Sequence, residues 1–290
     1  MNKNILITGY SGFIGKYLTG FLKNKGYNVI PLKQDIKNPV NVDDKIDVVI
    51  HLAYLITNKT SNNINNVNVG GITNLLNFCK ENKSKLIFTS TIQVYGNQKI
   101  LPIKENTEHN PYNRYSESKI IGENLCRKYS QLYNLKCIIL RLSNVYGNGM
   151  KKGYAIYDIV NNAKIDKPIF LNQPDVKRDF IYINDVLQAF LKSIEYDKKI
   201  FDIFNICLGK SYSLNEVVDI TSKLLNKKLD VIYTRSWKED VLNIYGDISY
   251  SKSELNWGPS IDLSEGIKCM LTWKYYSYGL ARIHLVYVNL

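Results

Sequence analysis

Tyr115 and Lys119 lie four residues apart in a stretch with helical spacing, so both side chains would share one face of a helix. A phenol with an ordinary pKa of about 10 is a poor base at neutral pH, and a neighbouring ammonium favours its ionised form. The pair therefore predicts proton transfer, with Lys119 bringing Tyr115 toward its working range. The alternative is a surface tyrosine beside a solvated lysine, because the chain has 22 tyrosines.

Thr91 is a further candidate, because it ends an apolar run in a group of hydroxyl side chains. The run is Leu86-Ile87-Phe88-Thr89-Ser90-Thr91, and Val94-Tyr95-Gly96 follows it. At the carboxyl edge of a sheet, Thr91 could hydrogen-bond the same substrate oxygen that Tyr115 protonates or deprotonates. Hydroxyls at a strand end are more often part of a turn, but the nearby motifs favour a catalytic role.

Three glycines, Gly9, Gly12 and Gly15, follow the apolar run Ile5-Leu6-Ile7-Thr8 with the spacing G-x-x-G-x-x-G. An amphipathic stretch comes next, so the pattern predicts a buried strand that turns sharply into a helix. Gly9 permits the turn, Gly12 lets the backbone approach a pyrophosphate, and Gly15 lets the helix pack on the strand. The helix N-terminus would offer unpaired N–H groups to the phosphates. An ordinary Gly-rich turn is the alternative, but its setting between strand and helix favours a dinucleotide site.

Apolar, β-branched runs alternate with helix-length amphipathic stretches along the chain. The predicted strands are Ile5–Thr8, Val29–Leu32, Val48–Leu52, Leu86–Thr89, Cys137–Leu142 and Phe201–Ile206. The predicted helices are Phe13–Lys25, Val67–Glu81, Tyr112–Tyr133 and Val186–Tyr196. Crossovers of this length join parallel strands that are buried on both faces. The predicted fold class is α/β, a Rossmann-type doubly wound parallel sheet with a smaller C-terminal substrate-binding lobe.

The sequence pattern changes after about Asn148, where prolines separate shorter predicted elements. We assign residues 1–148 to a nucleotide-binding domain, whose sheet is completed by a later strand near residues 201–206, and residues 149–290 mainly to the lobe. Ser213 and Glu216 form a capping box that predicts another helix. The lobe is expected over the carboxyl edge of the sheet, where open α/β sheets bind ligands. The apolar, aromatic residues after about Lys274 would be an added strand or an oligomer contact.

Composition narrows the function classes. The 290 residues are 45% hydrophobic and 22% charged, which is typical of a soluble globular protein. The first apolar run is too short for a signal peptide, and no stretch approaches the roughly 18 apolar residues of a membrane span. We therefore expect a cytoplasmic protein with no membrane partner.

The net charge of +12 raises the alternative of a polyanionic partner such as nucleic acid. The lysines are dispersed, however, which favours solvated faces and no nucleic-acid binding. Five scattered cysteines and three histidines show no ligand spacing, so neither disulfides nor a metal site is expected.

Taken together, these motifs resemble the extended branch of the short-chain dehydrogenase/reductase superfamily, the NAD(P)-dependent nucleotide-sugar epimerase/dehydratase family of UDP-glucose 4-epimerase-like proteins. The resemblance runs from Gly9 to about Trp273. Beyond the glycine turn, Thr91 with Val94-Tyr95-Gly96, and Tyr115/Lys119, the matching motifs are His51-Leu52-Ala53, Asn68-Val69-Gly70-Gly71, Arg141-Leu142-Ser143-Asn144-Val145-Tyr146-Gly147, Arg178-Asp179-Phe180-Ile181-Tyr182, Phe204-Asn205-Ile206 and Leu255-Asn256-Trp257-Gly258-Pro259.

The resemblance implies roles for the catalytic motifs. Tyr115 would be the acid/base, Lys119 would hold the nicotinamide ribose and lower the tyrosine pKa, and Thr91 would position the sugar hydroxyl. The cofactor-binding residues would be Gly9, Ser11, Gly12, Phe13, Ile14, Gly15, Lys33, Leu52 and Ala53.

Asn144 and Arg178 match positions that contact the diphosphate of the nucleotide sugar in this family. A guanidinium suits that bidentate anionic target. An ion pair of Arg178 with Asp179 or Asp185 is the alternative.

Two departures from the family pattern bear on the reaction. Lys33 stands where NAD-selective relatives often place an acidic residue, and a cation there suits a 2′-phosphate, so NADP is slightly favoured over NAD; Asp35 lies nearby, and a merely solvated Lys33 is the alternative. Ile92 and Gln93 follow Thr91 where family dehydratases usually carry acidic residues, which disfavours sugar 4,6-dehydration. The next strand also begins early, so the usual excursion after the second strand is shortened.

The resemblance implies hydride transfer between NAD or NADP and carbon 4 of a nucleotide sugar. A 4-epimerase would oxidise the alcohol, rotate the ketone and return the hydride to the other face. An NADPH-dependent reductase of an NDP-4-keto-6-deoxyhexose would consume reduced cofactor. Family frequency favours the epimerase, while Lys33 and the compact chain favour the reductase, which leaves the epimerase slightly ahead.

A non-catalytic NAD(P)-binding sensor or scaffold is a remote alternative, and the intact Tyr115, Lys119 and Thr91 argue against it. The resemblance also implies a homodimer formed through paired helices, including the helix that carries Tyr115.

Overall fold

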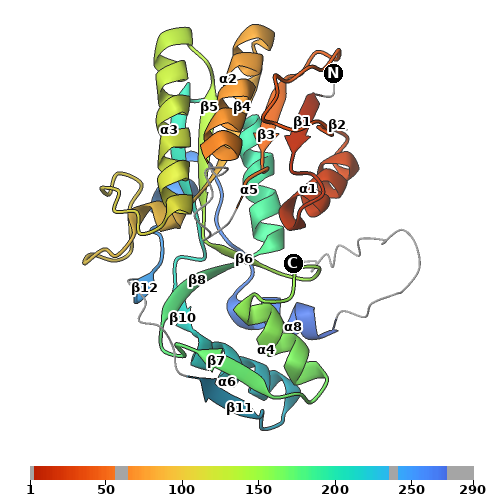
Figure 1. Ribbon diagram of the computed structural model, residues 1–290. Coiled ribbons are helices and arrows are strands. Elements are labelled where there is room, and N and C mark those ends of the chain that lie inside the picture. The colour runs from red at the N-terminus through yellow and green to blue at the C-terminus, as the bar shows by residue number, and fades with distance from the viewer. Residues whose placement is uncertain (1–2, 56–64, 235–240, 273–290) are drawn as a thin grey trace.

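A six-stranded parallel sheet forms the centre of the protein, in the order β2-β1-β3-β4-β5-β9 (Figure 1). The structure, a computed structural model, describes residues 3–55, 65–234 and 241–272. The strands are β1 (Asn4–Thr8), β2 (Asn28–Pro31), β3 (Val48–His51), β4 (Lys85–Thr91), β5 (Cys137–Leu142) and β9 (Phe201–Ile206), and every neighbouring pair is parallel. The predicted doubly wound parallel sheet is confirmed.

Helices cover both faces of this sheet. The helices α2 (Gly70–Asn82) and α3 (Arg114–Tyr133) lie on one face, and α1 (Phe13–Asn24) and α5 (Ile183–Glu195) lie on the other (Figure 1). Along β1 the side chains alternate between the layers: Leu6 packs in the cluster beneath α2 and α3, whereas Ile5 and Ile7 pack in the cluster with α1. Both faces of the strand are therefore apolar, which explains why its sequence lacks polar alternation.

The chain reverses its direction of travel across the sheet at β1. It first goes to β2 on one side of β1, and then returns to β3 on the other side. Such a switch point is where open α/β sheets bind ligands, at the carboxyl ends of the strands. Only β2 lies on the outer side of β1 in the described sheet, which fits the shortened excursion after the second strand.

A lobe of shorter elements lies beyond the carboxyl ends of the strands (Figure 1). Within it β8 (Lys177–Tyr182) pairs with β6 (Asn144–Tyr146), β10 (Ser211–Ser213) and β12 (Asn243–Ile244), while β7 (Ile169–Asn172) pairs with β11 (Val231–Thr234). Its helices are α4 (Ala155–Lys164), α6 (Leu214–Leu225) and α8 (Leu263–Thr272), while α7 (Ser249–Glu254) packs beside β9.

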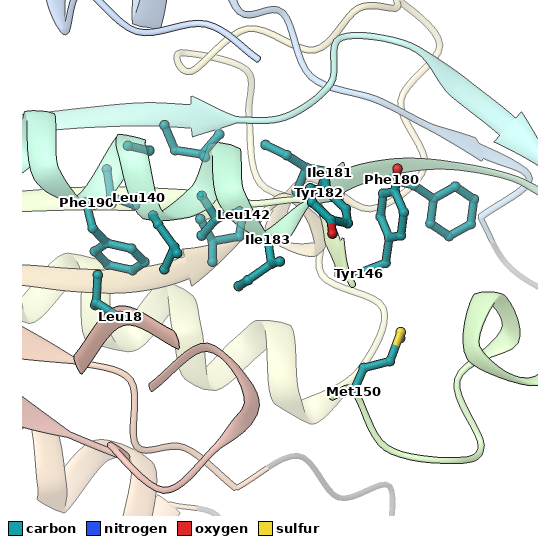
Figure 2. Packing of buried hydrophobic residues seen from close by; sticks show 14 of the residues in the cluster. Leu18, Leu140, Leu142, Tyr146, Met150, Phe180, Ile181, Tyr182, Ile183 and Phe190 are labelled. Carbon is teal, nitrogen blue, oxygen red and sulfur yellow. The ribbon is translucent and has the colours of Figure 1, made fainter. Parts of the chain in front are cut away.

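One apolar cluster joins the lobe to the layer beneath the sheet. Figure 2 shows Leu18 and Phe190 at one end of this cluster and Tyr146 and Phe180 at the other, with Ile183 between them. Because the cluster is continuous, the lobe shares a hydrophobic core with the sheet layer.

Several helix and strand ends differ from those predicted. The helix predicted from Val186 begins at Ile183, and β4 continues two residues past Thr89 to Thr91. The helix predicted from Val67 starts as a π-helical turn, η1 (Asn65–Val69), before α2. The capping box of Ser213 and Glu216 is confirmed, because both of its hydrogen bonds are present at the start of α6.

The lobe strands β6, β7, β8, β10, β11 and β12 are not in the prediction, because each depends on a partner strand that is distant in sequence. The apolar tail after Lys274 lies outside the described residues. Among the helices that are described, none is long and apolar enough to cross a membrane.

Gly122 lets α3 approach the sheet, and this contact gives the first prediction. A Cβ at Gly122 would lie 2.6 Å from Cζ of Phe88, whose ring is itself stacked on His51. We expect Gly122→Ala to lower the free energy of unfolding by about 1–2 kcal/mol, because overpacking outweighs the gain in helix propensity. Urea unfolding measures this change.

Gly70→Ala is the matched control, because Gly70 is also helical and a Cβ there would meet nothing within 4 Å. This control is expected to be neutral or slightly stabilising. Equal effects of the two substitutions would contradict the close approach of α3 to Phe88.

Candidate active site

The helix α3 begins at Arg114, two residues later than predicted, because Asn113 caps its N-terminus. Oδ1 of Asn113 accepts a hydrogen bond from the backbone N–H of Ser116 at 2.8 Å, and the Ser116 hydroxyl lies 3.4 Å from the backbone N–H of Asn113. This capping box satisfies N–H groups that a helix start leaves unpaired. It places Tyr115 in the first turn of α3 and Lys119 in the second.

The ammonium of Lys119 is buried in an aromatic surrounding, and the residue is only 2% exposed. Nζ donates a hydrogen bond to the carbonyl oxygen of Thr89 at 2.6 Å. The same nitrogen lies 3.1 Å from the ring centroid of Tyr54, 4.9 Å from that of Phe88 and 5.7 Å from that of Tyr115. One carbonyl and the faces of neighbouring rings therefore stabilise the charge.

Burial raises the pKa of the Tyr115 phenol, and the nearby phenols of Tyr154 and Tyr112 raise it further. The sequence predicts the opposite shift, a lowering by Lys119. The difference arises because burial penalises the phenolate, while the shortest contacts of the Lys119 ammonium are with a backbone carbonyl and with the ring of Tyr54.

Burial also lowers the pKa of Lys119, and the carboxylate of Glu123 opposes this effect. Both members of the pair are therefore biased by burial toward their neutral forms. A cation beside the phenol has to act against that bias.

Thr91 is the last residue of β4 and is buried. Its Oγ1 accepts a hydrogen bond from the backbone N–H of Gln93 at 3.3 Å and so caps the 3₁₀ turn η2 (Ile92–Tyr95). Lys119 is bonded to the carbonyl of Thr89, two residues earlier on the same strand. The structure therefore brings Lys119 to the strand end that carries Thr91.

The glycine turn leaves no room for side chains where β1 meets α1. Gly9 has a φ of +67°, and a Cβ there would lie 2.7 Å from the backbone nitrogen of Ala53; a Cβ at Gly15 would lie 2.2 Å from the carbonyl oxygen of Gly9. Gly12 caps α1 with no side chain. The first N–H groups of α1, beside Ser11, Phe13 and Ile14, are thus left to an anion, as a dinucleotide site requires.

A cavity of about 250 Å³ opens at the switch point beside this turn. Gly9, Ala53 and Tyr54 line it, together with residues that follow β2. Leu52, which is also predicted to bind the cofactor, does not line the cavity, and its backbone N–H donates to Oγ1 of Thr8 at 3.2 Å. The cavity and the bare helix terminus fit a nicotinamide dinucleotide.

The residues after β2 change the expectation for the cofactor. Lys33 is exposed and does not line the cavity, whereas Gln34 and Asp35 do. The ammonium of Lys37 forms an ion pair with Asp35 at 3.0 Å. A hydrogen bond from the backbone N–H of Lys37 lowers the pKa of the Asp35 carboxyl. Since a carboxylate in this place suits free ribose hydroxyls, the argument for NADP from Lys33 loses its geometric support.

A second cavity, of about 200 Å³, lies within the lobe, where residues of β6, α4, β7 and β8 line it. Asn144, Arg178 and Tyr154 all line it, so the two predicted substrate-binding residues share one cavity. Nδ2 of Asn144 donates to the carbonyl of Asp179 at 3.1 Å, and Nη1 of Arg178 donates to the carbonyl of Lys177 at 3.0 Å.

The carboxylates considered as partners of Arg178 are bonded to backbone groups. Asp179 accepts from the N–H groups of Leu208 and Gly209 at 2.8 and 2.9 Å, and burial raises its pKa to about 6. Asp185 accepts from the N–H of Ser260 at 3.0 Å. These bonds fix the loop after β9 to β8 and the segment after α7 to α5.

Each cavity has a lining tyrosine that acts on Tyr115. Tyr54 lines the first cavity and its ring meets that of Tyr115 edge-on, with centroids 5.9 Å apart. Tyr154 lines the second cavity, and its phenol lies close enough to raise the pKa of Tyr115. A dinucleotide in one cavity and a second ligand in the other would therefore meet at Tyr115 and Lys119.

A buried ion pair that the sequence analysis missed supports this arrangement. Glu123 lies one turn after Lys119 on α3, and its carboxylate accepts two hydrogen bonds from Arg141 of β5, at 2.6 and 3.0 Å. The Ser90 hydroxyl donates to the same carboxylate, and Arg141 also donates to the phenol of Tyr95 at 2.6 Å. The sequence signals are the spacing of Glu123 four residues after Lys119 and the place of Arg141 at the start of a matching motif.

His51 is a second residue near the site whose role the sequence does not predict, although it belongs to the His51-Leu52-Ala53 motif. It is fully buried, and its Nδ1 lies 2.8 Å from Oγ1 of Thr8. Burial lowers its pKa to about 3, helped by the charge of Lys119. His51 is therefore a neutral neighbour of the site.

The fold and this site define an enzyme that uses a nicotinamide dinucleotide. Residues 5–207 match the NAD dependent epimerase/dehydratase family. A protein of Methanocaldococcus jannaschii with the provisional name UDP-glucose 4-epimerase is 34% identical, with 93% of this chain and 97% of that protein covered. The dTDP-4-dehydro-6-deoxyglucose reductase of Escherichia coli is 30% identical, with 91% and 95% covered.

A solved structure agrees with these sequence matches. The crystal structure of a UDP-glucuronic acid 4-epimerase variant from Bacillus cereus, in complex with UDP-4-deoxy-4-fluoro-glucuronic acid and NAD, is 26% identical with a TM-score of 0.84, and 92% of this chain and 98% of that chain are covered. The chain therefore belongs to the NAD dependent epimerase/dehydratase family and is an NAD(P)-dependent enzyme.

The ion pair gives a stability prediction. Glu123→Gln leaves the buried guanidinium of Arg141 without its counter-charge, so we expect a loss of about 3–5 kcal/mol in the free energy of unfolding. Replacing both partners, Glu123→Leu with Arg141→Met, should cost less than the sum of the two single changes. Urea unfolding of the unaltered protein, Glu123→Leu, Arg141→Met and the double variant measures the coupling. Additive costs would contradict a direct interaction.

The cofactor cavity gives a third prediction, which concerns dinucleotide binding. Asp35→Ala should weaken NAD binding about tenfold and leave NADP binding equal or stronger, because the carboxylate suits ribose hydroxyls and repels a 2′-phosphate. Lys33→Ala is the matched control at an exposed neighbour and should change neither constant. Titration of intrinsic fluorescence with each dinucleotide checks this, and loss of NADP binding in Lys33→Ala alone would restore the expectation from the sequence.

Proposed function

We propose that the protein is an NAD-dependent nucleotide-sugar 4-epimerase, which inverts the hydroxyl at carbon 4 of a hexose through a 4-keto intermediate. The observation that carries this proposal is that a lining tyrosine from each of two cavities, Tyr54 in one and Tyr154 in the other, acts on Tyr115. One cavity adjoins the glycine turn, and the other is lined by Asn144 and Arg178.

The cofactor would be held at the switch point of the sheet. The N–H groups at the start of α1 bind its pyrophosphate, Asp35 binds ribose hydroxyls, and Ala53 forms the cavity wall. When bound, NAD accepts and returns a hydride, so an epimerase consumes none of it.

The protein's own groups handle the proton. Tyr115 accepts the proton of the carbon-4 hydroxyl when the alcohol is oxidised and returns it to the ketone oxygen afterwards. Thr91 hydrogen-bonds the same oxygen and so keeps it within reach of the phenol. The charge of Lys119 stabilises the phenolate, and it counts for more here than in water because the residue is buried.

The second cavity would hold the nucleotide diphosphate. The guanidinium of Arg178 and the amide of Asn144 offer donors to the phosphates from strands that meet in this cavity. Tyr154 lines that cavity and also raises the pKa of Tyr115, which supports placing the sugar there.

The choice of an epimerase over a 4-ketoreductase rests on Asp35. Lys33 as an NADP ligand would favour a reductase. The cavity, however, is lined by Asp35 and not by Lys33. The compact chain and the similarity to the E. coli reductase keep an NADPH-dependent 4-keto-6-deoxyhexose reductase as the second candidate. Ile92 and Gln93, which open the turn η2, supply no acid for dehydration.

We also propose that the enzyme is a cytoplasmic homodimer. Exposed apolar side chains along α3, including Ile121 and Leu132, support pairing through this helix.

The central test uses Tyr115. Tyr115→Phe should lower turnover by about 10²–10⁴-fold, because no other group replaces the phenol as acid/base. Tyr133→Phe, at the exposed far end of the same helix, is the matched control and should retain full activity. The assay follows UDP-sugars by chromatography and NADH or NADPH by absorbance.

Each outcome has a distinct meaning. Interconversion of epimers without net cofactor change supports the epimerase, whereas stoichiometric loss of NADPH with a 4-keto sugar supports the reductase. Full activity in Tyr115→Phe would exclude the proposed mechanism.

A further inference from the structure

Tyr54 occupies a position in this chain that none of the roles above uses. It follows β3 directly after the His51-Leu52-Ala53 motif and lines the cavity at the glycine turn. The next residue, Leu55, is tied down by Asn68: its N–H donates to Oδ1 at 2.9 Å, and its carbonyl accepts from Nδ2 at 3.2 Å. Nδ2 of Asn68 also lies 3.2 Å from the hydroxyl of Ser118 on α3. The backbone around Tyr54 is therefore anchored to the helix of the catalytic pair.

The side chain of Tyr54 contacts that helix at three points. Its hydroxyl donates to the carbonyl of Ser118 at 2.9 Å. Its ring meets the ring of Tyr115 edge-on at 5.9 Å, with an interplanar angle of 86°. The Nζ of Lys119 lies over its face at 3.1 Å from the centroid. The ring thus lies against the ammonium and the phenol at the same time.

The other charged or titratable groups around Lys119 do not replace this contact. The carboxylate of Glu123 is shared with Arg141 through two hydrogen bonds. His51 is neutral, since its pKa is lowered to about 3, and burial raises the pKa of the Cys126 thiol, which keeps it neutral too.

From β4, the contact with Lys119 is an uncharged carbonyl, that of Thr89. An ammonium over an aromatic face is stabilised more strongly when it is desolvated than when it is exposed. Tyr54 therefore supplies the nearest π face to this buried charge, with Phe88 and Tyr115 farther away.

We propose that Tyr54 is a positioning residue of this site, which holds the Lys119 ammonium beside Tyr115 through a cation–π contact. The inference rests on the proposed function, because it assigns Lys119 the task of stabilising the Tyr115 phenolate. Tyr54 acts through its ring, and its hydroxyl serves only to fix the ring against Ser118.

The direction of the effect follows from this contact. Without the ring, the protonated form of Lys119 is less stable, so its pKa falls. The phenolate of Tyr115 then loses support, and Tyr115 gives up its proton only at higher pH. The pH profile of turnover should narrow from both sides, with the acid limb moving up and the basic limb moving down.

The experiment compares Tyr54→Leu and Tyr54→Phe with the unaltered protein. The first readout is the titration of the isotope-labelled lysine Cε resonance of Lys119, assigned by its loss in Lys119→Met. We expect its midpoint to fall by about one pH unit in Tyr54→Leu, roughly a tenfold change in the ionisation constant. Tyr54→Phe should match the unaltered protein. The second readout is the pH profile of kcat, with the dissociation constant for NAD measured in parallel.

Tyr133→Leu is the matched control, because Lys80 lies over the exposed Tyr133 ring at 5.1 Å, far from the site along α3. This change should alter neither readout. Tyr54→Met, which also lacks a ring, replaces Tyr54→Leu if that variant fails to fold.

The outcomes separate this inference from the proposed function. An unchanged Lys119 titration in Tyr54→Leu and Tyr54→Met, or equal loss of activity at every pH, would overturn the role of Tyr54 and indicate a merely structural one. Full activity in Tyr115→Phe would instead overturn the proposed function, while the lysine titration still reports on the contact with Tyr54.

Discussion

Glu123 and Arg141 form a buried ion pair where the helix α3 meets the central sheet. Removing two charges from water is costly, and such a pair persists only when its remaining hydrogen-bonding groups are satisfied. Here the carboxylate accepts twice from Arg141 and once from Ser90, while the guanidinium also donates to Tyr95 and to the carbonyl of Glu105. The pair therefore fixes α3, β4 and β5 in one register. Because Lys119 and Tyr115 lie one and two turns before Glu123, the register of the reactive groups depends on it.

The sheet positions the two ligands around this fixed helix. Its switch point puts the glycine turn, Ala53 and Asp35 around one cavity, and the strand pair β6–β8 puts Asn144 and Arg178 around the other. The apolar cluster that runs from α1 to the lobe packs the lobe against the layer beneath the sheet (Figure 2). The lobe is thus a continuation of the core, and the site forms where two parts of one packed structure meet.

Features with a local cause could be predicted from the sequence. The glycine turn, the Tyr115–Lys119 spacing and the capping box at Ser213 each depend on neighbours within a few residues, and so do the apolar runs of the six central strands. Features set by distant contacts could not be predicted. The residue after β2 that faces the cavity depends on how the chain leaves the strand, so Lys33 and Asp35 could not be told apart. The pairing of Glu123 with Arg141 joins residues 18 apart in sequence, and short strands such as β12 form only because β8 is beside them.

The most instructive difference concerns the pKa of Tyr115. From sequence, a lysine one turn away implies a lowered value, yet burial raises it in the structure. The two statements describe one low-dielectric environment, which penalises an isolated phenolate and at the same time strengthens the attraction of any cation beside it. A solvated Lys119 would be screened and would do little, whereas a buried one is effective but inclined to lose its proton. The residues that decide this balance are therefore those that keep the buried ammonium charged and in place. In this protein they are the carboxylate of Glu123, the carbonyl of Thr89 and the rings of Tyr54 and Phe88.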